Sequence, residues 1–102
     1  MNRPIPRFLD AVVTTWETVS AASATACQST IKRAEDDSKL TIAIQTPQFT
    51  ATIAAWEQAY CLDITLFERA TGSGAELSAG ECTSLEEMQE RITLLCEMLI
   101  VK

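Results

Sequence analysis

The sequence predicts an α+β protein with an N-terminal helix, an antiparallel meander sheet of four or five strands and a C-terminal amphipathic helix. Apolar residues recur with helical spacing near both ends of the chain and with a two-residue period between them. Turn-forming clusters separate these segments. Because one face of each strong strand is apolar, we expect both helices on a single face of the sheet. The 102 residues, 47% of them hydrophobic and 22% charged, suit a single domain over residues 1–102.

The first segment, Arg7 to Ala22, is expected to be a helix because one stripe of large apolar side chains recurs at spacings of four, four and three. The stripe consists of Phe8, Val12, Trp16 and Val19. The following stretch, Cys27 to Glu35, alternates without a convincingly apolar side. It is therefore a weak candidate for an edge strand.

Three segments with a two-residue period predict the centre of the sheet. They run from Lys39 to Thr46, from Phe49 to Glu57 and from Tyr60 to Phe67. Pro47 lies between the first two segments and ends the first strand, because proline donates no backbone hydrogen bond to a sheet. The two segments are therefore expected to form a hairpin. After a turn at residues 71–74, a short last strand is expected over Ala75 to Gly80.

The last segment predicts a long amphipathic helix. Thr83 is expected to cap its first turn, with Glu86 reaching back to the cap. The predicted core combines the apolar stripes of both helices with the apolar face of the strands. It comprises Phe8, Val12, Trp16, Leu40, Ile42, Ile44, Ile53, Leu62, Ile64, Leu66, Met88, Ile92, Leu95 and Leu99.

The net charge of −6 is unevenly distributed along the chain. Residues 1–56 carry five acids and five bases, whereas residues 57–97 carry nine acids and two bases, a net charge of −7. Such a field repels nucleic acid and anionic lipid and steers basic protein surfaces toward the domain. It equally suits simple solubility. No segment is apolar for the ~20 residues that a membrane helix needs, and we expect a cytoplasmic protein.

The residue types present exclude several kinds of chemistry. The chain has no histidine, so it cannot form a Cys-His or Ser-His nucleophile pair or an imidazole metal site. Its four cysteines are separated by 34, 21 and 14 positions, and we expect them to be reduced and mostly buried. Acid–base catalysis by paired carboxylates is possible in principle, for example with Glu57 and Glu68 flanking Asp63 on neighbouring strands. Carboxylates on a half-exposed sheet are usually solvated, however. We therefore expect no enzyme activity, no cofactor and no metal.

What remains is a binding surface. If Leu62, Ile64 and Leu66 face the core, Phe67 lies on the opposite face of the sheet, and the same reasoning places Trp56 there. Aromatic side chains ringed by charge are typical of protein interfaces. The predicted partner-binding residues are Trp56, Glu57, Asp63, Phe67 and Glu68. The alternative is that Trp56 points into the core or is covered by a loop.

Several short motifs resemble those of a known family. They are Leu40-Thr41-Ile42-Ala43-Ile44, Phe49-Thr50-Ala51-Thr52-Ile53, Ala55-Trp56-Glu57, Cys61-Leu62-Asp63-Ile64, Ala70-Thr71-Gly72 and Ser84-Leu85-Glu86-Glu87-Met88. In order and residue type the stretch Lys39 to Ile92, about half of the chain, is similar to the TriTu family of immunity proteins of bacterial polymorphic toxin systems. The resemblance implies a cytoplasmic antitoxin that forms a 1:1 complex with the toxin domain of an Rhs-type, type VI secretion effector. That toxin would be an ADP-ribosyltransferase acting on elongation factor Tu, with its active site blocked by the antitoxin.

Two other classes stay open. A small acidic secretion chaperone or adaptor would form a homodimer and recognise an extended segment of its client. A small enzyme using a cysteine or a carboxylate would show turnover that is lost when one acid is changed.

Overall fold

A computed structural model describes residues 8–22 and 27–100 and confirms the predicted order of elements. Arg7, expected in the first helix, lies outside the described residues. A single 3-10 turn, η1, separates the third and fourth strands. The elements are α1 (Phe8–Ala22), β1 (Gln28–Arg33), β2 (Lys39–Gln45), β3 (Phe49–Trp56), η1 (Gln58–Tyr60), β4 (Cys61–Glu68), β5 (Gly74–Ser78) and α2 (Leu85–Ile100).

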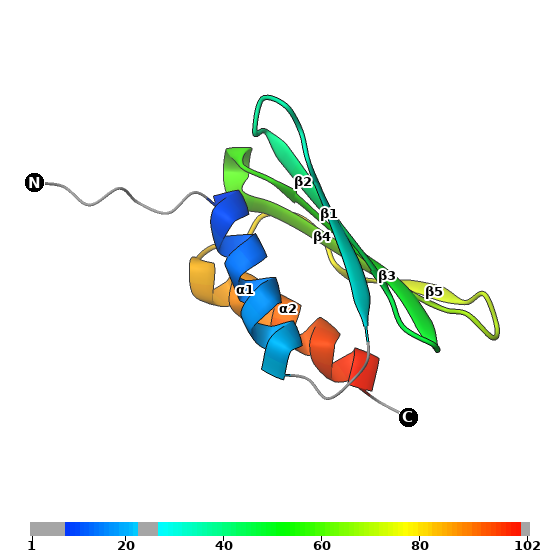
Figure 1. Ribbon diagram of the computed structural model, residues 1–102. Coiled ribbons are helices and arrows are strands. Elements are labelled where there is room, and N and C mark those ends of the chain that lie inside the picture. Colours follow the sequence, from blue (N-terminus) through cyan, green and yellow to red (C-terminus); the bar gives the residue numbers. More distant parts are fainter. Residues whose placement is uncertain (1–7, 23–26, 101–102) are drawn as a thin grey trace, which may run out of the picture.

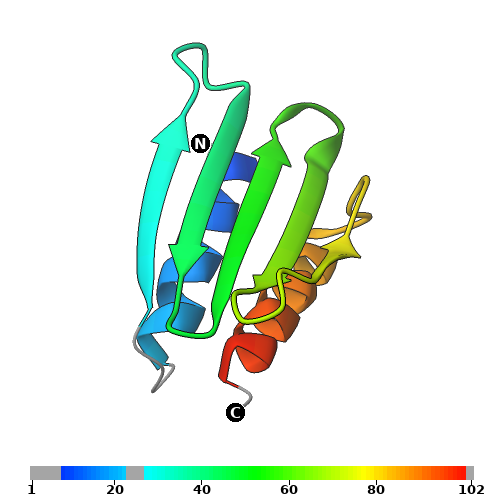
Figure 2. The same cartoon turned by 90° about the vertical axis from the view of Figure 1, so that its right-hand side faces the viewer.

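The five strands form one antiparallel sheet in the order β1-β2-β3-β4-β5, so each strand pairs with its neighbour in the chain. Both helices lie on the same face of the sheet and run in the same general direction, which leaves the other face without a covering layer (Figures 1 and 2). The architecture is therefore the two-layer α+β arrangement that the sequence predicts.

The core lies between the inner face of the sheet and the two helices. Every residue of the predicted core is buried, and Ile42, Ile53 and Ile64 lie opposite one another across the three central strands. The structure adds Leu9, Ala51, Ala55, Cys82 and Cys96 to the core. Both alanines lie on β3 and are buried, and their small side chains leave room for the larger core side chains packed around them.

The predicted edge strand exists as β1, and all six of its residues are exposed. Its register with β2 is unbroken from Gln28 opposite Gln45 to Arg33 opposite Leu40. Ile31 faces the helix side and is 39% exposed. The sequence pattern of this strand is weak because none of its side chains is buried.

The opposite edge, β5, is shorter and irregular. A register shift between Ile64 and Thr65 interrupts its pairing with β4. The strand ends at Ser78, two residues earlier than expected, because the chain turns at Gly80, whose φ of 89° suits glycine. From there the chain leads into α2.

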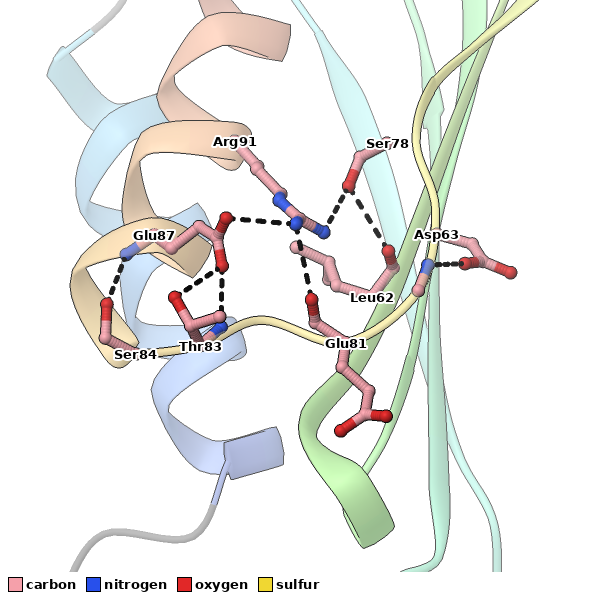
Figure 3. Close-up of polar contacts among 9 residues, drawn as sticks. Leu62, Asp63, Ser78, Glu81, Thr83, Ser84, Glu87 and Arg91 are labelled. Atoms are coloured by element: carbon pink, nitrogen blue, oxygen red, sulfur yellow. Dashed lines mark hydrogen bonds and ion pairs between the residues drawn. The ribbon is translucent and has the colours of Figure 1, made fainter.

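The predicted cap of α2 is displaced by one residue (Figure 3). The Ser84 hydroxyl, not that of Thr83, accepts a hydrogen bond from the N–H of Glu87 at 3.1 Å. The Glu87 carboxylate, not that of Glu86, reaches back and accepts from the N–H of Thr83 at 2.6 Å. The difference follows from the helix starting at Leu85, which makes Ser84 the capping residue.

Arg91 fastens this end of α2 to the sheet (Figure 3). Its guanidinium donates to Ser78 Oγ at 2.9 Å and to the carbonyl of Glu81 at 3.3 Å, and it pairs with Glu87 at 3.2 Å. Ser78 Oγ in turn donates to the carbonyl of Leu62 on β4. The hydrogen bonds to Arg91 and Thr83 lower the pKa of Glu87, with the Thr83 N–H as the largest cause.

Candidate functional site: two exposed surfaces

The outer face of the sheet carries mostly small polar side chains. The register places Thr30, Ala43, Thr52 and Thr65 in one row across four strands. The side chains of β2, β3 and β4 that point to the other face are mostly buried under the helices, whereas no described element covers this face. We call it the open sheet face.

Trp56 lies at one end of the open sheet face, half-buried, as the residue pattern predicts. Lys39, directly opposite on β2, places its ammonium 5.0 Å from the centre of the indole ring. Asp63 is on the same face, two residue pairs along the β3–β4 ladder, and its carboxylate accepts a hydrogen bond from the N–H of Gly80 at 3.1 Å. This end of the face therefore combines an aromatic ring, a cation and an acid.

Phe67 lies at the other end and is 48% exposed. Its ring covers Gly74 on β5, and a Cβ at that position would collide with the ring. Trp56 on β3 is opposite Cys61 on β4, whereas Phe67 on β4 is opposite Thr50, which lies six residues before Trp56 on β3. The two aromatic residues are therefore about 20 Å apart.

Glu57, which was predicted to bind a partner beside Trp56, is bound to the start of α1 instead. Its two carboxylate oxygens accept hydrogen bonds from the N–H groups of Phe8 at 2.9 Å and Leu9 at 3.2 Å. These are unpaired donors of the first turn of α1. Tyr60, with φ of 51°, stacks on Phe8 with ring centres 4.8 Å apart. The β3–β4 connection thus holds the start of α1.

Glu68 also has an internal partner, because the hydroxyl of Thr71 donates to its carboxylate at 2.9 Å within the β4–β5 turn. The five residues predicted to bind a partner consequently do not form one patch. Trp56 and Asp63 are at one end of the open sheet face, and Phe67 is at the other. Glu68, opposite Phe49, falls on the helix side of β4, and Glu57 is bound to α1.

A second surface, which the sequence reasoning missed, lies on α2. Leu94 is 49% exposed, and Glu86, Glu90 and Glu97 surround it on the side of the helix facing away from the sheet. Gln89 and Thr93 lie beside them on the same open, exposed surface. We call Glu86, Glu90, Leu94 and Glu97 the acidic ridge. Their spacing of four, four and three is a signal that the sequence already contains.

The acids of the ridge differ from Glu57, Asp63 and Glu68 in having no partner side chain or N–H group in the part of the chain that the structure describes. Within the described part of the chain, the side chains of Glu86, Glu90 and Glu97 make no hydrogen bond or ion pair. Their charges are therefore directed to solvent, next to an exposed apolar side chain.

The thiols are free and unequal in exposure. Cys82 and Cys96 are buried, whereas Cys27 and Cys61 are half-buried. Burial raises the pKa of Cys96 to about 11 and also raises that of Cys82. A thiol with a raised pKa is a poor nucleophile at neutral pH, because the thiolate is the reactive form.

Within residues 8–22 and 27–100, no group of three or more cysteine and acidic side chains is placed to hold a metal ion. Neither helix of the described residues is long and apolar enough to cross a membrane. No protein-family model, curated protein or solved structure matches the chain. The candidate sites are therefore the two surfaces, defined by geometry and charge.

Proposed function

We propose that the protein is a cytoplasmic immunity protein that binds a cognate toxin domain and occludes its active site through the acidic ridge. The observation that carries the proposal is the set of three carboxylates near the half-exposed Leu94, none of which has a partner among residues 8–22 and 27–100. An apolar centre within a charged rim is the usual composition of a protein interface. The acids accelerate encounter with a basic partner, and the burial of Leu94 slows dissociation.

The toxin in this proposal is an ADP-ribosyltransferase from an Rhs-type, type VI secretion effector that acts on elongation factor Tu. The motif resemblance at residues 40–88 supports this class. An enzyme that binds a dinucleotide presents positive charge to the two phosphates. Carboxylates on a rigid helix can take the phosphate positions, which excludes the dinucleotide from the cleft.

Co-expression tests the function. Bacteria that produce the C-terminal domain of a neighbouring Rhs-type reading frame should stop growing, and growth should return when this protein is produced with it. Purified protein should block NAD-dependent labelling of elongation factor Tu at a 1:1 ratio. Persistent killing and labelling with excess protein would contradict the proposal.

Charge reversals test the surface. E86K/E90K changes the ridge, and E17K/E35K changes two exposed acids elsewhere by the same net charge. We expect the ridge variant to slow association at low salt by about tenfold or more, and the control to change it little. Equal effects would remove the ridge from the interface. In that case W56A, which tests the open sheet face, should raise the dissociation rate.

The secretion chaperone is the rival function, and the same assays separate the two. A chaperone binds its client without suppressing the activity of the folded toxin domain. Protection by the protein in cells that lack the secretion apparatus therefore favours the immunity function.

A further inference from the structure

The outer edge of β1 presents unused backbone groups. The N–H of Ala34 donates to the carbonyl of Lys39 at 2.9 Å, and these two residues continue the β1–β2 register. Hydrogen-bonded pairs alternate in an antiparallel ladder, so the even-numbered residues of β1 direct their backbone groups to β2. The backbone groups of Ser29, Ile31 and Arg33 therefore point away from the sheet, where no described strand lies.

The two edges of the sheet differ in how open they are to another strand. Shortness, bulges and covering loops normally blunt an edge. β5 has five residues and a register shift, and the chain turns from it into α2. β1 has six residues in unbroken register, all of them exposed (Figure 2). The open edge is therefore that of β1.

We propose that a second copy of this chain occupies this edge, with its β1 antiparallel to the first around a two-fold axis at Ile31. In this register Ile31 faces the Ile31 of the second copy, and Ser29 faces Arg33. All three residues with outward backbone groups are then paired on each chain. Three hydrogen-bonded residue pairs supply about six backbone hydrogen bonds.

The side chains favour this register over its neighbours. The two Ile31 side chains, each 39% exposed in the single chain, come into contact on the helix side. Lys32 faces Thr30 of the second copy on the open sheet face. A shift by two residues in one direction would place Lys32 opposite Lys32, which repels. A shift in the other direction loses the contact between the two isoleucines.

The charge distribution also permits this pairing. Arg33, the other cation of the strand, pairs with Asp10 at 2.7 Å and with Asp37 at 3.0 Å. The net charge of −7 lies in residues 57–97, which include β4, β5 and α2, on the other side of the sheet (Figure 2). Pairing through β1 brings the neutral parts together and leaves both acidic ridges free. Each subunit keeps its own toxin-binding surface.

Sedimentation over a range of protein concentrations tests the dimer. The wild type should shift from monomer to dimer as the concentration rises. I31K places two like charges on the axis and should raise the dissociation constant at least about tenfold. T18K, which adds the same charge at an exposed position of α1, should dimerise as the wild type does. Circular dichroism verifies that each variant is folded.

Cross-linking tests the register. Residues on the axis of a hydrogen-bonded pair have Cα atoms about 5.5 Å apart, which suits a disulfide. I31C should therefore form a covalent dimer under mild oxidation. K32C, the neighbouring exposed residue, faces Thr30 and should form little. A wild type that stays monomeric at about millimolar concentration, or equal cross-linking of the two variants, would overturn the proposal.

A homodimer is also the state expected of the rival chaperone, so the dimer alone does not decide between the two functions. The dimer and the immunity function can fail separately. If I31K is monomeric and still protects cells, both proposals stand and dimerisation is not needed for protection. If the wild type dimerises but does not bind the toxin, only the proposed function falls.

Discussion

The Glu57 carboxylate accepts a hydrogen bond from the N–H of Phe8, 49 positions earlier in the chain. The contact links the end of β3 to the first turn of α1, and Leu9 donates to the same carboxylate. A negative charge at a helix N-terminus also interacts favourably with the helix dipole. Because the bond spans two layers, it fixes where α1 begins and how its N-terminal end meets the sheet.

Replacing Glu57 should therefore weaken the whole fold. E57A removes both acceptors and should reduce the free energy of unfolding by about 1 to 2 kcal/mol, as for the loss of a helix cap. E57Q keeps one acceptor oxygen and should lose less. Urea unfolding measures both, with E17A on the exposed side of α1 as the control. If E57A and E17A unfold at the same urea concentration, the contact does not stabilise the protein.

Gly74 and Phe67 should be energetically coupled. A Cβ at residue 74 meets the Phe67 ring, so G74A must displace the ring and lose its contact with β5. When the ring is absent, in F67A, the same change should stabilise the protein by about 0.4 to 1 kcal/mol, because alanine reduces the entropy of the unfolded chain. A double-mutant cycle measured by thermal or urea unfolding yields the difference. Additive effects would show that the ring does not rest on Gly74.

Acid should loosen the start of α2. Hydrogen bonds hold the pKa of Glu87 below its usual value of 4.5. A lowered pKa stabilises the fold above the unfolded-state pKa, and this contribution is lost as the pH falls through the folded-state value. Unfolding followed from pH 6 to pH 2 should therefore show less acid sensitivity for E87Q than for the wild type. E86Q, which lacks the contacts with Thr83 and Arg91, should keep the wild-type slope.

Alkali should act through Cys96. Burial disfavours the thiolate and raises the pKa of Cys96 from its usual value of 9.0 to about 11 in the folded state. The unfolded chain loses the proton first, so stability should decline from pH 9 to about pH 11. C96A should flatten this part of the pH profile, whereas C61A at a half-buried site should not. Peptide mapping after alkylation at pH 8 should also find Cys96 modified more slowly than Cys61.

The core could be predicted from the sequence because its signal is local. The alternation of apolar and polar residues in β2, β3 and β4 indicates which side of each strand is apolar. When the three apolar sides face the same way, Ile42, Ile53 and Ile64 lie next to one another, as observed. Two features were less clear. β1 has no apolar side to detect, and the cap of α2 moved from Thr83 to Ser84 because adjacent hydroxyl residues offer equivalent patterns.

The candidate site could be predicted only in part, because it depends on contacts between distant residues. The two-residue period places Trp56 and Phe67 on the open sheet face, as observed. It does not reveal that Glu57 is bound to α1 or that the two aromatic residues lie at opposite ends of the face. The acidic ridge was missed for another reason. The spacing along α2 was used to find the buried stripe, and the exposed stripe beside it carries the same period.

The meander order of the sheet has a consequence for synthesis. Each strand pairs with the one made just before it, so the sheet can assemble in step with the emerging chain and with few distant contacts to search for. The second helix consists of residues 85–100, and Met88, Ile92 and Leu95 complete the core. A chain that stops before residue 85 lacks these side chains and leaves part of the apolar sheet face uncovered. Exposed apolar surface of this kind promotes aggregation, so we expect such a fragment to be far less soluble than a chain that includes α2.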